Sequence, residues 1–142
     1  MTRARDSVIS MADVGLTQGM HCRVWLAIVG SRTTTEEISK RLGLVATKTL
    51  REGLATPLGA IATVNRWEFL IPIDRLEPLD NHLEVLEGLL TGDRAETLRQ
   101  LSIEADVRVE VEIAHDNGIV ISSNLVRLVA DAGGSFDIDV RY

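Results

Sequence analysis

The stretch DVRVEVEIA, residues 106–114, alternates apolar and polar side chains almost from end to end. In a β-strand this period of two places one set of side chains on a single face. The apolar set is Val107, Val109, Val111 and Ile113. A sheet of such strands buries one face and leaves the other in water, so helices are expected on one side only. The stretch therefore predicts an α+β fold.

Three further segments are predicted strands, and they differ in how many of their faces are apolar. RWEFLIPI (66–73) and SFDIDVRY (135–142) alternate in the same way, and Pro72 indicates an edge position or the end of a strand. RVWLAIVG (23–30) is apolar on both faces. Because the faces of a central strand are the most covered, this segment is predicted to lie in the middle of the sheet.

Four helices are predicted between these strands, each with one apolar face. A capping box at residues 34–37 begins the first helix, and Gly43 ends it. A leucine stripe predicts a second helix over residues 78–90, and a short third helix begins at Asp93. The fourth is predicted over residues 124–132, after a serine cap.

The order of these elements predicts two βαβ halves, residues 24–73 and 107–140, with an extra helical pair between the halves. Right-handed crossovers would interleave the halves into a ferredoxin-like, four-stranded antiparallel sheet with helices on one face. We expect a single domain over residues 21–142. Residues 1–20 show little periodicity and are expected to form a flexible N-terminal tail.

Composition limits the class of protein. The 142 residues are 45% hydrophobic and carry a net charge of -6. No apolar run approaches the ~20 residues that a membrane span needs, and the segment after Arg5 is too polar for a signal peptide. The single cysteine, Cys22, excludes an internal disulfide and a multi-cysteine zinc site. We expect a soluble, cytoplasmic protein with no membrane contact.

The segment TTTEEISKRLGLVATKTLREG, residues 33–53, opens like a helix-turn-helix. Residues 1–51 carry a net charge of +4, which favours nucleic-acid binding, but residues 52–142 carry a net charge of -10, which opposes it. A recognition helix after Gly43 would need apolar residues where Thr49 and Glu52 stand. We therefore predict a crossover helix followed by a loop, and nucleic acid is a disfavoured partner.

The loop over residues 45–65 is long for a compact domain, and such loops are often functional. Its basic and hydroxyl side chains, with the tryptophan after it, suggest a site for an anionic small molecule. The candidate ligand-binding residues are Thr47, Lys48, Arg51, Gly53 and Trp67. No phosphate-binding motif is present, so a solvated loop is the favoured interpretation and the anion site is the alternative.

No catalytic site, metal site or cofactor is predicted. The histidines, His21, His82 and His115, lack the spacing of metal ligands. A carboxylate cluster is predicted across two strands, where Asp137 and Asp139 would meet Glu110 and Glu112. Such a cluster suits a hard cation, or forms a solvated face offset by arginines. The solvated face is the favoured interpretation.

The sheet face away from the helices is a predicted interface. On the central strand, Trp25, Ala27 and Val29 point outward between charged neighbours. An apolar centre with a polar rim is typical of a protein contact. A homodimer, another protein or the N-terminal tail would cover it. A single tryptophan in an acidic field does not suit RNA recognition.

The order and spacing of these motifs resemble the bacterial domain-of-unknown-function family numbered 4279. The features that carry the resemblance are the strand ending at Gly30, TTEEISKRLGL, ATKTLREG, the isolated Trp67, LDNHLEVLEGLL and ISSNLVRLVADAGGSFDIDVRY. The resemblance covers about residues 22–142 and implies a small stand-alone bacterial domain without an assigned catalytic residue. It implies signature positions at Thr47, Gly53, Trp67 and Tyr142.

These observations predict a small, non-enzymatic binding or interaction module, with dimerisation through the sheet face as one mode. Two other classes remain open. One is a sensing domain for an anionic metabolite that uses the loop over residues 45–65. The other is a DNA-binding regulator that uses residues 33–53.

Overall fold

The computed structural model describes residues 21–114 and 119–141. These residues form five strands and four helices. In chain order the elements are β1 (Cys22–Val29), α2 (Thr35–Leu42), β2 (Lys48–Leu50), β3 (Arg66–Leu70), α3 (Leu79–Leu89), α4 (Gly92–Leu101), β4 (Asp106–Ile113), α5 (Ser123–Asp131) and β5 (Gly134–Val140). The predicted tail over residues 1–20, the position of His115 and Tyr142 lie outside the described residues.

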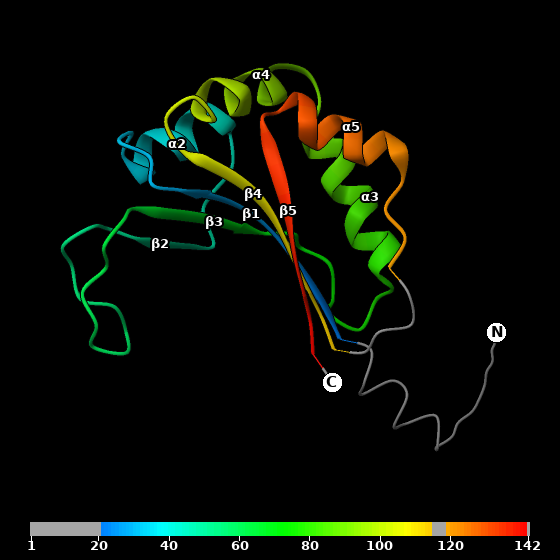
Figure 1. Cartoon of the computed structure of the whole chain (residues 1–142), viewed down its shortest axis with the longest axis horizontal. Helices are drawn as coiled ribbons and strands as arrows, with labels where there is room; N and C mark the ends of the chain where they lie inside the picture. Colours follow the sequence, from blue (N-terminus) through cyan, green and yellow to red (C-terminus); the bar gives the residue numbers. More distant parts are fainter. Residues whose placement is uncertain (1–20, 115–118, 142) are drawn as a thin grey trace.

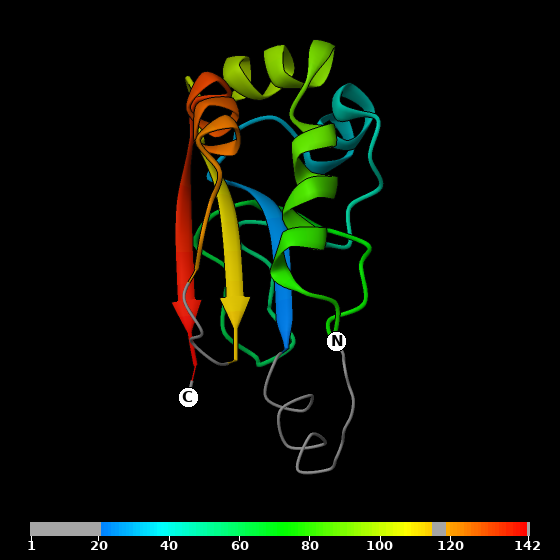
Figure 2. The same cartoon turned by 90° about the vertical axis from the view of Figure 1, so that its right-hand side faces the viewer.

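The strands form one mixed sheet in the order β2-β3-β1-β4-β5. Neighbouring strands are antiparallel except β4 and β5, which are parallel. All four helices lie over the same face of the sheet (Figures 1 and 2). The predicted α+β class and the central position of β1 are therefore confirmed, but the predicted four-stranded antiparallel ferredoxin-like sheet is wrong.

The difference arises in both halves of the chain. In the second half, β5 pairs directly with β4 and parallel to it, so the two halves do not interleave as predicted. In the first half, the strand parallel to β1 is β2 and not the segment over residues 66–73. Both β1 and β2 are antiparallel to β3, which lies between them. The unit β1-α2-β2 is thus a split crossover with a third strand inserted. Strand β2 has three residues and lies at the sheet edge with exposed side chains, so it has no hydrophobic alternation to reveal it.

The core lies between the sheet and the helices. Helix α2 begins where the Oγ1 of Thr34 accepts a hydrogen bond of 3.2 Å from the backbone N–H of Glu37, and it ends at Gly43 with φ 68°. Both predicted caps are confirmed. The largest fully buried side chains are Trp67, Leu26, Ile28, Ile38, Ile71, Leu86, Leu90, Leu98, Leu101, Leu125, His82 and Val24. Within the described residues, no helix has both the length and the apolarity of a membrane span.

The second helix that a helix-turn-helix requires is replaced by strand. After α2, the chain enters β2 at Lys48 and pairs with β3, with Thr49 opposite Trp67. Its side chains are Lys48 and Thr49, which are exposed, and Leu50, which is partly exposed, so they could not pack a recognition helix on α2. The predicted crossover helix is confirmed in this segment.

His82, in the first turn of α3, is the one histidine buried among the described residues. Neither ring nitrogen has a hydrogen-bond partner of normal geometry. Burial lowers the pKa of this imidazole, while the backbone near Glu77 and Asp74 acts in the opposite direction. The folded protein therefore favours the neutral ring.

The pH dependence of stability should report this histidine. The unfolded chain binds a proton near the ordinary histidine pKa of about 6.5, whereas the folded chain binds it only at lower pH. Stability from His82 is thus fully present above that pH and falls below it, by at most about tenfold in the unfolding equilibrium per pH unit. Urea midpoints measured from pH 8 to pH 5 should fall less steeply in His82→Leu. Parallel curves for the two proteins would contradict this.

Candidate functional site

The predicted ligand loop is a hairpin arm, defined here as residues 51–65, between β2 and β3. The N–H of Gly53 donates to the carbonyl of Ala62 at 2.9 Å, and the N–H of Ala62 donates to the carbonyl of Leu54 at 2.9 Å. A β-bridge joins Ala55 and Ile61 beyond them. These backbone contacts give the arm a ladder of its own, so the predicted loop is an ordered hairpin whose residues are mostly exposed to solvent.

One asparagine fastens the base of the arm. The side-chain oxygen of Asn65 accepts from the N–H of Glu52 at 2.9 Å, and its Nδ2 donates to the carbonyl of Ser31 at 2.9 Å. The backbone carbonyl of Asn65 also accepts from the N–H of Gly30 at 2.8 Å. Both sides of the hairpin are thereby held against the end of β1.

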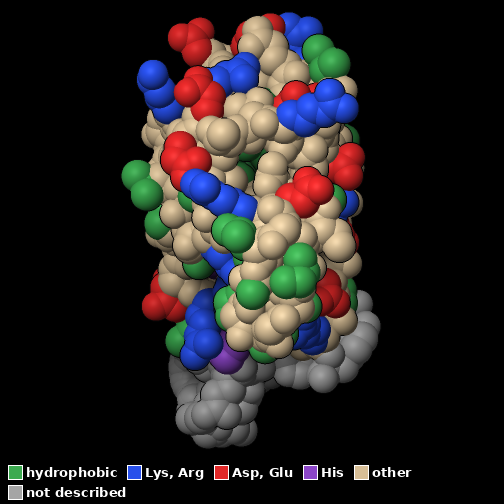
Figure 3. All heavy atoms as spheres, turned by 90° about the vertical axis from the view of Figure 1, so that its left-hand side faces the viewer, with side chains coloured by type: hydrophobic (Ala, Val, Ile, Leu, Met, Phe, Trp, Pro, Cys, Tyr) green, Lys and Arg blue, Asp and Glu red, His purple; other side chains and the backbone are tan. Residues whose placement is uncertain are grey.

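Beyond Glu52, the surface of the arm is uncharged and largely apolar. No Lys, Arg, Asp or Glu occurs from residue 53 to residue 65. The arm extends past the ends of β2 and β3, away from the helices (Figure 1). Figure 3 views the molecule from this side and shows hydrophobic side chains at the surface. Leu58 at the tip is 95% exposed. The other exposed large apolar side chains of the arm are Leu54, Ile61 and Val64.

The structure brings four of the five candidate ligand residues together along this sheet edge. The hydroxyl of Thr47 accepts from the N–H of Leu70 at 2.8 Å. Lys48 is exposed on β2, Arg51 forms an ion pair with Glu36 of α2, and Gly53 adopts a positive φ of 86° where the arm begins. Thr47 and Gly53 thus have clear structural roles in the edge and its turn.

The fifth candidate, Trp67, lies on the opposite face of β3. Its side chain is 0% exposed, and its Nε1 donates to the hydroxyl of Ser39 in α2 at 2.9 Å. The indole also stacks against Phe69, with ring centroids 6.5 Å apart. Trp67 is therefore part of the core, separated from the surface of the arm by the sheet itself.

The predicted interface residues Trp25, Ala27 and Val29 lie on the open sheet face, as expected. Charged side chains centred on Arg66, called here the charged layer, cover this face over Ala27. Arg66 on β3 pairs with Glu110 on β4, and β1 runs between these two strands. In the strand register, Arg66 lies opposite Val29 and Glu110 lies opposite Trp25. The guanidinium of Arg66 must therefore pass over Ala27, which lies between them and is 0% exposed. Trp25 and Val29 remain partly exposed.

Arg66 is the centre of this layer, and the sequence patterns did not single it out. Burial disfavours its charge, but hydrogen bonds with Glu110 and Glu68 raise the pKa of Arg66 above its usual value. The available signal in the sequence was the alternation of β3, which places residue 66 on the open face because residue 67 points to the core. Trp25 adds a contact of its own, because the guanidinium carbon of Arg23 lies 5.5 Å from its ring centroid.

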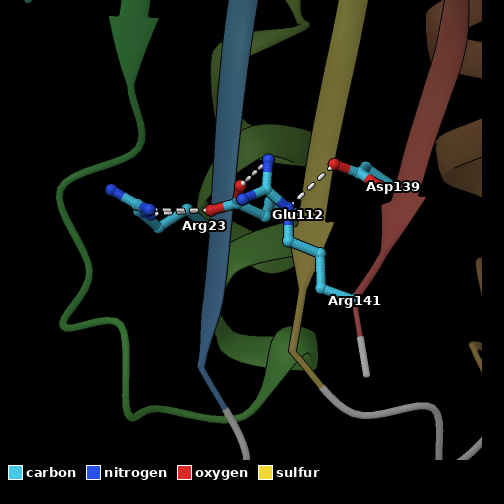
Figure 4. Close-up of polar contacts among 4 residues, drawn as sticks. All are labelled: Arg23, Glu112, Asp139 and Arg141. Atoms are coloured by element: carbon cyan, nitrogen blue, oxygen red, sulfur yellow. Dashed lines mark hydrogen bonds and ion pairs between the residues drawn. The ribbon is translucent and has the colours of Figure 1, made fainter.

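The layer continues toward the end of the sheet, where two arginines hold one glutamate. Arg23 Nη2 lies 2.8 Å from one carboxylate oxygen of Glu112, and Arg141 Nη2 lies 2.9 Å from the other (Figure 4). Arg141 Nε also lies 3.0 Å from Asp139. A hydrogen bond with Asp139 and the charge of Glu112 raise the pKa of Arg141.

The predicted carboxylate pairing across β4 and β5 is confirmed. Glu110 faces Asp137, and Glu112 faces Asp139, in the parallel register. Of the two arginines predicted to offset these charges, Arg141 does so, whereas Arg108 pairs with Asp106 instead. Arg66 and Arg23 take part in its place. In residues 21–114 and 119–141, no three acidic, histidine or cysteine side chains are grouped as metal ligands.

Comparison with known proteins gives one match. The family model for a domain of unknown function (DUF4279) matches residues 20–142. No curated protein and no solved structure matches the chain. Of the signature positions that the resemblance implied, Thr47, Gly53 and Trp67 have structural roles in the edge strand, the arm and the core.

Proposed function

We propose that this chain, which belongs to the DUF4279 family, is a non-enzymatic interaction module that pairs with a second copy of itself through the arm. The observation that carries the proposal is the apolar surface of the arm, with Leu58 at its exposed tip. Burying such side chains against a partner yields roughly 25 cal/mol per Å² of apolar surface removed from water.

The arm is built to stay extended. Its internal hydrogen bonds keep its two sides paired, and the contacts of Asn65 fix its base to the end of β1. A hairpin that is already ordered loses little conformational entropy on association, so more of the burial energy is available for binding. An ordered arm is therefore better suited to docking on a partner than a flexible loop would be.

Charge supports a second copy as the partner. The chain carries a net charge of -6, so two copies repel each other over most of their surfaces. The arm has no charged residue between Glu52 and Arg66, and two arms can therefore meet without like-charge contact. In a symmetric dimer the same patch serves both partners.

The four exposed apolar side chains of the arm are too small to form a stable interface alone. Stable interfaces bury about 1,200 to 2,000 Å² in total. Among the described residues, strand β2 offers an unpaired outer edge beside the arm, and Val45 is exposed where the chain approaches that strand. The proposed interface therefore comprises the arm, β2 and Val45.

Leu58→Glu should weaken dimerisation by about a hundredfold, because it places a charge within the apolar contact. Sedimentation velocity over a concentration series measures the dissociation constant. Ile103→Glu is the matched control, since Ile103 is 87% exposed but lies between α4 and β4. It should leave the constant unchanged.

A wild-type protein that stays monomeric at about 0.5 mM would overturn the proposal, as would equal effects of the two variants. Dimerisation through the sheet face predicts a different pattern. In that case Trp25→Glu would dissociate the dimer and Leu58→Glu would not.

A further inference from the structure

A cavity of about 170 Å³ opens at the end of the sheet that lies beyond Glu112. Its lining comes from the start of β1, the loop after β3, the end of β4 and the residue after β5. The lining residues are His21, Arg23, Arg75, Glu112, Ala114 and Arg141. Three of these six residues are arginines, in a chain whose net charge is negative.

Backbone hydrogen bonds fix the four segments around this cavity. The N–H of Cys22 donates to the carbonyl of Arg75 at 2.8 Å, and the N–H of Ala114 donates to the carbonyl of His21 at 2.9 Å. The N–H of Arg141 donates to the carbonyl of Ile113 at 2.8 Å. The arginines therefore come from backbone positions that are already set before any ligand arrives.

Glu112 orients two of the guanidinium groups. Arg23 uses its Nε and Nη2 on one carboxylate oxygen, and Arg141 uses its Nη2 on the other, so the two approach Glu112 from different sides (Figure 4). A guanidinium has five N–H donors. These ion pairs hold the side chains in place and leave further donors on each for another group.

We propose that this cavity binds a small oxyanion, a phosphate or a carboxylate group, between Arg23, Arg75 and Arg141. The planar guanidinium fork matches both kinds of oxyanion. The volume admits one such group and a short chain attached to it, but no nucleotide. Glu112 is paired with two arginines, so its charge opposes the ligand less than an unpaired carboxylate would. The proposal does not depend on the arm.

The test is a titration of the full chain with inorganic phosphate and, separately, with succinate. Isothermal titration calorimetry at constant ionic strength gives the affinity, and chloride serves as the reference anion. Arg75→Gln should weaken binding of the preferred anion at least tenfold, because it removes a charge-assisted hydrogen bond. Arg141→Gln should do the same. Arg99→Gln, in an exposed pair with Glu96 on α4, is the matched control and should bind as the wild type does.

Binding of phosphate alone identifies a phosphate site, and binding of succinate alone identifies a carboxylate site. Circular dichroism verifies that each variant is folded. Absence of binding for both anions overturns the proposal. Equal affinities of wild type, Arg75→Gln and Arg141→Gln also overturn it, as does an equal loss in Arg99→Gln. These substitutions lie outside the arm and should leave dimerisation unchanged, so failure here is distinct from failure of the arm proposal.

Discussion

Trp67→Ala is expected to lower the free energy of unfolding by about 3–5 kcal/mol. The indole is fully buried beneath α2, and its removal leaves a large cavity beside Phe69. It also leaves the hydroxyl of Ser39 without its indole donor. Urea unfolding followed by far-ultraviolet circular dichroism measures the change.

Trp25→Ala is the matched control, because Trp25 is the other tryptophan and lies partly exposed on the open face. It should cost about 1 kcal/mol, from lost packing and the contact with Arg23. If the two alanine variants were equally stable, the assignment of Trp67 to the core would fail. Trp67→Phe should recover part of the loss.

Arg66→Met should lower the free energy of unfolding by about 2 kcal/mol. The variant keeps an apolar stem over Ala27 but leaves Glu68 and Glu110 without their shared cation. Both glutamate side chains are largely buried, so water replaces the lost partner incompletely. Urea midpoints at neutral pH report the effect.

Two comparisons isolate the charge contribution of Arg66. Adding Glu110→Gln to Arg66→Met should restore about half of the loss, and the double-mutant cycle measures the coupling. Arg99→Met disrupts an ion pair with Glu96 that is exposed on both sides, and should cost under about 0.5 kcal/mol. Equal costs for Arg66→Met and Arg99→Met would show that the layer over Ala27 does not stabilise the fold.

The sequence patterns predicted the elements of this fold better than their arrangement. Alternation revealed β4 and β5, and caps at Thr34 and Gly43 revealed α2, because these signals are local. Strand β2 is short, exposed and stabilised by pairing with β3, which is a tertiary contact. Without β2, the segment over residues 66–73 was predicted to be the parallel partner of β1. The predicted interleaving also failed in the second half, where β5 pairs directly with β4.

The candidate site was predicted in outline only. The sequence marked the loop over residues 45–65 and the outward face of β1, which are the two surfaces described here. It grouped Trp67 with the loop because the two are adjacent in the chain, but a period of two places that indole on the core side of β3. The cavity near Glu112 gathers four separate segments, so no single stretch of sequence indicates it.

The central place of β1 also bears on how the chain folds during synthesis. Its partner β4 is made much later, since Arg23 and Glu112 are 89 residues apart. At usual rates of translation this interval is on the order of ten seconds. Until then β1, which is apolar on both faces, has only β3 as a neighbour. A nascent chain arrested before residue 106 would therefore leave one edge of this apolar strand unpaired, and ribosome-bound chaperones should bind it there.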